Sequence, residues 1–158
     1  MLGLKIIAVG KLKDKYLHAA EDEYRKRLTR FCAPEIVELK DEPTPDNPTP
    51  RERDAVLAKE AERIEGALPQ RASIYTLCVE GKEYSSEDFA ELLEQDVNAG
   101  RSICFVIGGS LGMAESIKKQ SRRISLSRMT FPHRLARIIL LEQVFRAFKI
   151  MNNETYHK

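Results

Sequence analysis

Short apolar runs rich in branched side chains alternate with segments of helical periodicity along the whole chain. Runs of roughly four to eight such residues indicate buried strands, whereas apolar residues that recur every three or four positions indicate helices. The pattern predicts an α/β fold with a mostly parallel sheet of about five strands and with helices on both faces. A length of 158 residues fits a single domain, residues 1–158.

The expected strands cover residues 4–10, 35–40, 73–79, 102–107 and 124–127. The expected helices cover residues 14–30, a segment that begins at Pro50, a segment after Ser85, a basic segment that ends at Arg123, and the region after His133. Thr49 and Glu52 have the spacing of a capping box and so mark the start of the second helix. Residues 40–50, which hold four prolines, form a loop whose role the sequence leaves open.

Side-chain spacing makes two further predictions about these helices. In the first helix, three acidic side chains each lie four positions before a basic one, so we expect ion pairs on the face away from the core: Glu21 with Arg25, Asp22 with Lys26, and Glu23 with Arg27. In the second helix, the apolar residues that recur on one face, and that we expect to be buried, are Leu57, Ala61, Ile64 and Leu68.

Charge is unevenly distributed along the chain. The formal net charge is only +2, yet residues 118–158 hold 10 basic and 2 acidic side chains. This segment is a candidate surface for a nucleic acid or another polyanion. The alternative is a solvated face without a partner, since many charge clusters only solubilise a surface.

The three cysteines, Cys32, Cys78 and Cys104, lack the spacing of a metal site or a redox motif, and we expect reduced thiols in the core. The three histidines are too far apart for a zinc site, so no metal is expected. The longest apolar stretch is interrupted by Arg137 and Glu142, and no basic-then-apolar leader begins the chain. We therefore expect a cytoplasmic protein that does not associate with membranes.

The candidate binding site lies at the ends of three expected strands. In open α/β sheets, ligands bind beyond the carboxyl ends of the strands, here after Leu77, Ile107 and Leu126. The second of these loops, GGSLG from Gly108, allows a ligand to approach the main chain closely. It matches neither a P-loop nor a GxGxxG fingerprint, and a tight turn without any ligand would have the same sequence.

The third loop leads into the last helix and is rich in arginine. Arg128, Arg134 and Arg137 gather where the backbone amides of a helix N-terminus already favour an anion. Arginines scattered over the surface are the alternative. Further along the helix, Glu142 and Arg146 have the spacing of a local ion pair, which we favour over direct catalysis. The broad apolar surface of this helix is expected to pack on the sheet and on a second copy in a symmetric dimer.

Four segments together resemble one known family: TLCVEGK from Thr76, FVIGGSLG from Phe105, SLSRMTFPHRLARIILLEQVFRAFKI from Ser125, and the terminal TYHK. They are similar to the SPOUT (α/β-knot) RNA methyltransferases, and among these to the family that methylates N3 of a pseudouridine in 23S ribosomal RNA of the large subunit. The resemblance implies a C-terminal trefoil knot, S-adenosyl-L-methionine (SAM) as the cofactor, a homodimer, and the large ribosomal subunit or the assembled 70S ribosome as the partner.

The resemblance also implies residue roles. The cofactor-binding residues would be Leu77, Gly108, Gly109, Leu126, Ser127, Arg128, Met129, Thr130 and Phe131. The tail, residues 154–158, would complete the pocket of the partner subunit. The chemistry of the reaction, and not the resemblance, supplies the candidate catalytic residues: His133 or His157 would accept the N3 proton, and Arg137 or Arg146 would stabilise the uracil anion. Tyr156 would contact the flipped base. The sequence does not choose among the proton acceptors.

Two other classes of function remain open at this point. A nucleotide- or flavin-binding module without catalysis would share the α/β pattern, but it would not explain the basic C-terminal segment. A structural, ribosome-binding dimer would bind RNA without affinity for the methyl donor. Measurements of methyl-donor binding and of methyl transfer to RNA distinguish the methyltransferase from these two other classes.

Overall fold

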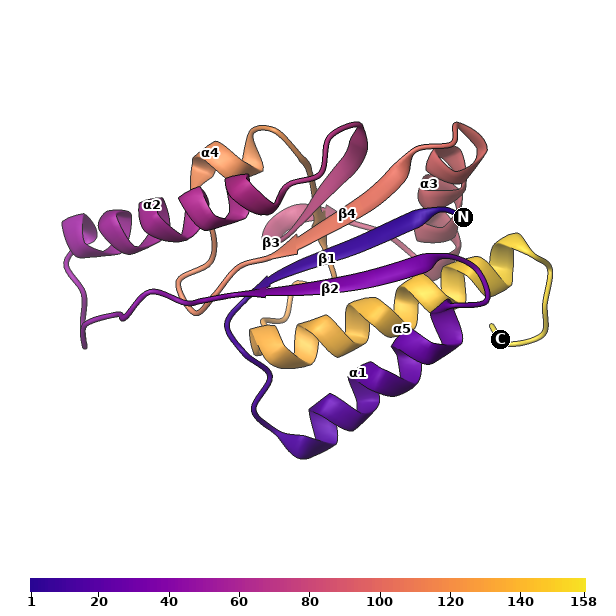
Figure 1. Cartoon of the computed structure of the whole chain (residues 1–158), viewed down its shortest axis with the longest axis horizontal. Coiled ribbons are helices and arrows are strands. Elements are labelled where there is room, and N and C mark those ends of the chain that lie inside the picture. Colours follow the sequence, from indigo (N-terminus) through magenta and orange to yellow (C-terminus); the bar gives the residue numbers. More distant parts are fainter.

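Five strands and five helices alternate along the chain in the computed structural model, which describes residues 1–158 (Figure 1). The strands are β1 (Gly3–Val9), β2 (Ala33–Leu39), β3 (Ala72–Glu83), β4 (Ser102–Ile107) and β5 (Arg122–Ser125). The helices are α1 (Lys15–Leu28), α2 (Pro50–Ala67), α3 (Ser86–Asn98), α4 (Glu115–Lys118) and α5 (His133–Met151). The predicted capping box is present, because the Thr49 hydroxyl and the Glu52 carboxylate accept from each other's backbone amides.

All strand pairs are parallel, and the order across the sheet is β2-β1-β4-β3-β5. The carboxyl ends of the strands therefore meet at one edge of the sheet, and the amino ends meet at the opposite edge. The short strand β5 forms one side of the sheet, next to β3. The predicted α/β fold is confirmed, whereas the trefoil knot stays a prediction.

Alternate residues of the central strands enter two separate cores. Ile6 and Phe105 pack with α1, α3 and α5 on one face of the sheet. Ile7 and Val106 pack with α2 and α4 on the other face. Figure 1 shows α2 and α4 above the sheet, and α1 and α5 below it. Apolar residues at consecutive strand positions are explained by this arrangement, because both faces of the sheet are covered.

Strand β3 is longer than predicted. We expected it to end at Val79, whereas it continues to Glu83. Its register with β5 shifts between Leu77 and Lys82, so the intervening residues bulge out of the ladder. Gly81 makes this possible, because a Cβ atom at that position would lie only 2.5 Å from the carbonyl carbon of Ile124.

The prediction that the basic helix ends at Arg123 is also wrong. Helix α4 ends at Lys118, and Arg122 and Arg123 already belong to β5. Both residues pair with β3, opposite Tyr75 and Thr76. Pairing along the edge of an existing sheet outweighs the weak helical preference of so short a segment.

Two predicted helix surfaces differ from the structure. On α1, the predicted pair of Glu23 with Arg27 is present at 2.9 Å. Glu21 is buried and pairs with Arg137 of α5, not with Arg25, because α5 covers this side of α1. On α2, the buried stripe is Val56, Glu60, Ala61 and Ile64, whereas Leu57 is only half-buried. Ala61 and Ile64 are therefore buried as predicted, whereas Val56 and the carboxylate of Glu60 take the place expected for Leu57.

The remaining predictions concern cysteines, metals and membranes. Cys32, Cys78 and Cys104 are all buried free thiols, as expected. No three His, Cys, Asp or Glu side chains gather in a metal-binding arrangement. None of the helices combines the length and the apolar character that a membrane-spanning helix requires.

Candidate functional site

A cavity of about 740 Å³ lies at the carboxyl ends of β3, β4 and β5. Its walls come from the bulged part of β3 that begins at Leu77, from the loops that follow Ile107 and Ser125, and from α4 and the first turn of α5. Of the residues that the resemblance implies for cofactor binding, only Arg128 does not line the cavity. The lining members of that set are Leu77, Gly108, Gly109, Leu126, Ser127, Met129, Thr130 and Phe131.

The loop after β4 folds back on itself at two glycines. Gly112 has a φ of +85° and donates its N–H to the Gly109 carbonyl at 3.0 Å. A Cβ atom at Gly108 would lie 2.3 Å from the Gly112 carbonyl oxygen, and one at Gly109 would lie 3.2 Å from Cγ1 of Val9. Side chains at these positions would therefore open the turn, and their absence brings the main chain to the cavity wall.

The loop after β5 is shaped by two local hydrogen bonds. The Ser125 hydroxyl donates to the Ser127 carbonyl at 2.9 Å, and the Met129 amide donates to the Ser127 hydroxyl at 3.0 Å. These bonds turn the chain so that Phe131 lines the cavity before α5 begins at His133. The same loop leaves the Met129 side chain 74% exposed at the cavity mouth.

His133 lines the cavity from the first turn of α5. Partial burial lowers the pKa of its imidazole below the ordinary 6.5, and the nearby cations Arg134 and Arg137 lower it further. The ring is thus mostly neutral at pH 7 and is able to accept a proton or a hydrogen bond.

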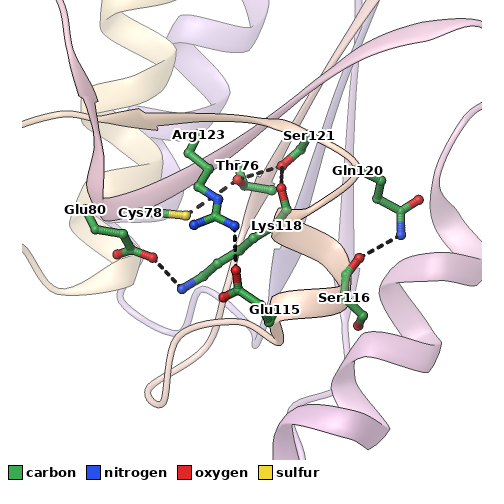
Figure 2. A network of polar contacts seen from close by, with 9 residues as sticks. All are labelled: Thr76, Cys78, Glu80, Glu115, Ser116, Lys118, Gln120, Ser121 and Arg123. Carbon is green, nitrogen blue, oxygen red and sulfur yellow. Dashed lines mark hydrogen bonds and ion pairs between the residues drawn. The ribbon is translucent and has the colours of Figure 1, made fainter.

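One ion pair lies on the cavity wall. Lys118 of α4 donates to Glu80 of the β3 bulge at 2.6 Å, and both residues line the cavity. The hydrogen bond with Lys118 lowers the pKa of the Glu80 carboxyl. Figure 2 shows the pair near a second pair, Arg123 with Glu115, and below the Thr76 and Ser121 hydroxyls, which lie 2.9 Å apart.

Arg137 lies in the core and not in the cavity. Its side chain is 1% exposed and donates to Glu21 at 3.0 Å, to Glu38 at 2.7 Å and to the Gly10 carbonyl at 3.2 Å. Partial burial opposes the effect, but the hydrogen bonds from Arg137 and from the Leu12 amide lower the pKa of the Glu38 carboxyl. These contacts engage both terminal nitrogens of the guanidinium inside the core, so we no longer count Arg137 among the candidate catalytic residues.

Arg146, Tyr156 and His157 lie together, but far from this cavity. Arg146 donates to Glu142 and lies 4.8 Å from the ring centroid of Tyr156. The Nδ1 atom of His157 lies 3.0 Å from Nη1 of Arg146, and its Nε2 atom contacts Glu87 of α3. The predicted local ion pair between Glu142 and Arg146 is present. The cluster is near the end of α5, about 20 Å along the helix from His133 at 1.5 Å per residue.

Residues 2–157 match a protein family described as "Predicted SPOUT methyltransferase". This chain belongs to the SPOUT methyltransferase family. Two relatives of this SPOUT methyltransferase are named ribosomal RNA large subunit methyltransferase H. The protein from Clostridium botulinum (strain Alaska E43 / Type E3) is 45% identical over 99% of this chain and 100% of its own length. The protein from Streptococcus equi subsp. zooepidemicus (strain MGCS10565) is 48% identical over 98% of this chain and 99% of its own.

The fold of the SPOUT methyltransferase also has a counterpart among solved structures. A methylase family protein from Neisseria gonorrhoeae aligns with a TM-score of 0.53 and 14% sequence identity. The alignment covers 91% of this chain and 82% of that one. At this identity the similarity supports the fold alone.

The sequence did not point to several residues of the SPOUT methyltransferase cavity. Glu80, Met113 and Lys118 line it, although none was among the candidates. Glu80 falls in the segment after Leu77 that the sequence predicts to be a loop of the site, and Lys118 falls in a helix that the sequence predicts to run to Arg123. The sequence predicts too short a strand β3 and too long a helix α4. With these bounds, an ion pair between Glu80 and Lys118 is not expected.

Proposed function

We propose that the protein transfers a methyl group from SAM to N3 of a pseudouridine in 23S ribosomal RNA, acting on the large subunit or the assembled ribosome. One observation carries the proposal: the bulged part of β3 and the loops after β4 and β5 line a single cavity in a chain of the SPOUT methyltransferase family. The names of the relatives supply the substrate class. Ribosomes lie in the cytoplasm, so we expect the protein to act there.

The cavity suits a nucleoside donor in size and in chemistry. A volume of about 740 Å³ falls within the range of small-molecule sites. Leu77, Leu126 and Phe131 offer apolar contacts for an adenine. Glu80 and Lys118 offer one negative and one positive group to a zwitterionic amino-acid end. When bound, SAM supplies a methyl group on a positively charged sulfur, whose bond to the methyl breaks as the bond to N3 forms.

The protein's own residues must then align the base and remove a proton. In-line displacement requires the nucleophile about 3 to 3.5 Å from the methyl carbon. The N3 atom carries a proton in neutral pseudouridine, and this proton must pass to an acceptor. His133 is the acceptor that we favour within one chain, because it lines the cavity and its pKa is held low. His157 remains the candidate from a second chain.

We propose that the working site combines two copies of the chain. The Arg146, Tyr156 and His157 cluster lies at the opposite end of α5 from the cavity, so it cannot reach the cavity of its own chain. Two α5 helices packed in opposite directions about a two-fold axis would place each cluster beside the other chain's cavity. The tail would then close over the flipped base.

Exposed apolar side chains near the cavity mouth support this arrangement. Val79 is 57% exposed, Met129 is 74% exposed, and Leu135 in the first turn of α5 is 41% exposed. Val79 and Met129 also line the cavity. Large exposed apolar side chains that gather in one region mark interaction surfaces. A second copy seated here would cover them and border the donor site.

The test is incubation of the purified protein with ribosomes and SAM that carries a labelled methyl group, followed by mass spectrometry of the 23S RNA nucleosides. We expect label on N3 of one pseudouridine. Donor binding by calorimetry without any transfer would instead support a non-catalytic module. RNA binding without donor binding would support a structural ribosome-binding protein.

A further inference from the structure

The structure divides the basic side chains of residues 118–158 into two sets. Five of the ten have a carboxylate within 4.0 Å: Lys118, Arg123, Arg137, Arg146 and Lys149. Figure 2 shows Lys118 and Arg123 directed at their acidic partners. The other five have no carboxylate within that distance: Lys119, Arg122, Arg128, Arg134 and Lys158. Only this second set is free to attract an anion.

Lys119 and Arg122 do not face the donor cavity. They line a second cleft of about 640 Å³ at the amino-terminal edge of the sheet. Its walls are Ser73, Ile74 and Tyr75 of β3, Leu92, Gln95 and Asp96 of α3, Arg101 before β4, and Lys119, Gln120, Ser121 and Arg122 around the start of β5. Both cationic side chains are exposed.

The floor of the second cleft is a closed polar network. Asp96 is 3% exposed and accepts from the Ser73 hydroxyl at 2.5 Å, from the Tyr75 hydroxyl, and from Arg101 at 3.0 Å. Burial and the hydrogen bond with Asp96 raise the pKa of the Tyr75 phenol, so it stays a neutral donor. Asp96 thus neutralises Arg101 and is itself fully bonded, which leaves the charges of Lys119 and Arg122 uncompensated.

Strand β5 connects this cleft with the donor cavity. Arg122 opens the strand beside the cleft, and Ser125 ends it beside the cavity, roughly 10 Å further along. That distance corresponds to about three nucleotides at 3.4 Å per nucleotide of a stacked strand. An RNA strand whose target base enters the cavity would reach the cleft a few nucleotides away.

We infer that the second cleft binds the phosphate backbone of the substrate RNA, with Lys119 and Arg122 as the principal contacts. The inference rests on the proposed function for the identity of the RNA. The exposed Gln95 side chain adds an amide group of the kind that phosphate oxygens accept from. These contacts fix the position of the RNA relative to the donor cavity and carry no base specificity.

The composition of the cleft favours RNA over an acidic protein. Protein interfaces are centred on exposed aromatic or aliphatic anchors. None of the large exposed apolar side chains of this protein lies in the cleft, where Tyr75 and Leu92 are buried. A polar hollow with two free cations matches a chain of phosphates instead.

The test compares two double variants of the full-length protein. Lys119→Gln/Arg122→Gln removes the free cations of the cleft. Arg25→Gln/Lys26→Gln is the matched control, because it removes one arginine and one lysine from the exposed surface of α1, neither of them in an ion pair. Both are assayed for melting temperature, for SAM affinity, for kcat and KM with ribosomes, and for binding to a 23S RNA transcript between about 50 and 200 mM salt.

For the cleft variant, we expect the KM for ribosomes to rise about tenfold, with kcat and SAM affinity within about twofold of the unmodified protein. The slope of log affinity for the transcript against log salt should fall by about 2, one for each lost phosphate contact. The control should match the unmodified protein. An unchanged KM and salt slope, or a loss confined to kcat, would overturn the inference. Inhibition by polyglutamate with unchanged RNA binding would also overturn it and assign the cleft to an acidic protein.

The same experiment separates this inference from the proposed function. Failure of the unmodified protein to label RNA would refute the proposed function. The transcript-binding comparison between the two variants would still decide whether the cleft holds a phosphate backbone.

Discussion

The Nδ1 atom of His157 lies 3.0 Å from Nη1 of Arg146, so the C-terminal tail is fastened to the end of its own α5. Tyr156 adds to this contact, because its ring lies 4.8 Å from the Arg146 guanidinium and packs edge-on against Phe145. In the proposed dimer, the fastening holds three candidate catalytic side chains together as one unit. The unit would act on the cavity of the other chain.

Removal of residues 154–158, or His157→Ala alone, should reduce turnover by at least about tenfold and leave SAM affinity unchanged. The reason is that in the proposed dimer the tail contacts the flipped base, whereas the cavity that holds the donor is lined by other residues. Calorimetry with SAM and single-turnover labelling of ribosomes measure the two effects. Unaffected turnover would remove the tail from the mechanism.

A Gly109→Val substitution should abolish SAM binding while the dimer persists. The first side-chain atom at this position would already lie 3.2 Å from Val9 and 3.6 Å from both carboxylate oxygens of Glu60, so the valine must displace the turn into the cavity. Gly66→Val is the matched control, because nothing lies within 4 Å of a Cβ atom there. Calorimetry and sedimentation provide the measurements, and retained SAM binding would place the donor elsewhere.

Mixing these two kinds of inactive protein tests the shared site. In a mixed dimer, the tail-deleted chain supplies an intact cavity and the Gly109→Val chain supplies an intact tail. These two parts form one complete site, and the other site of the dimer lacks both. Random exchange of subunits should therefore restore about one quarter of the activity, since half of the dimers are mixed and each has one complete site. If the mixture is no more active than either variant alone, the proposal that the site combines two chains is refuted.

The pH dependence of kcat should report on His133. Because the folded protein lowers the pKa of this imidazole, the ring is neutral and active above the lowered value, and activity is lost as the pH falls through it. We expect the acid limb to have its midpoint below 6.5, the ordinary value. In the His133→Gln variant, kcat should no longer fall on the acid side of the pH profile, and its value should be roughly 100-fold lower. A variant that keeps the limb would transfer the role to another group, His157 being the next candidate.

The sheet could be predicted from sequence because each central strand is apolar at consecutive positions and each helix between strands has an apolar stripe. Ile6 and Ile7, which enter opposite cores, show why the pattern is continuous and not alternating. The end of β3 could not be predicted, since Glu80, Gly81 and Lys82 look like a loop. They remain in a strand only because Gly81 lies against the backbone of Ile124, 43 positions later.

The donor cavity was predictable to the extent that it follows from topology, because the carboxyl ends of parallel strands converge. The second cleft was not, since Ser73, Asp96, Arg101 and Arg122 come from four separate segments. The burial of Glu21 was missed for a similar reason. Its spacing to Arg25 indicates a surface pair, but the true partner, Arg137, is 116 positions away and comes with α5.

Arg137 should behave as a structural residue. Arg137→Met would leave the carboxylate of Glu21 buried without a partner, because the side chains of Arg137 and Glu21 are 1% and 6% exposed. We expect a loss of about 3 to 5 kcal/mol in the free energy of unfolding, measured by urea denaturation. Adding Glu21→Gln to the variant should recover part of the loss. A single variant that unfolds normally but has lost turnover would instead return Arg137 to the catalytic residues.

Two adjacent lysines, Lys118 and Lys119, should have separate effects on donor and RNA. Lys118 lines the donor cavity and pairs with Glu80, whereas Lys119 lines the second cleft and has no acidic partner. Lys118→Met should therefore weaken SAM binding about tenfold, because it removes the positive group available to the donor's carboxylate and leaves Glu80 unpaired. Lys119→Met should leave SAM affinity unchanged and weaken only the binding of RNA. Calorimetry with SAM and salt-dependent RNA binding, run on both variants, measure the four values. Equal effects of the two substitutions on SAM would show that general surface charge, and not the Lys118–Glu80 pair, governs donor binding.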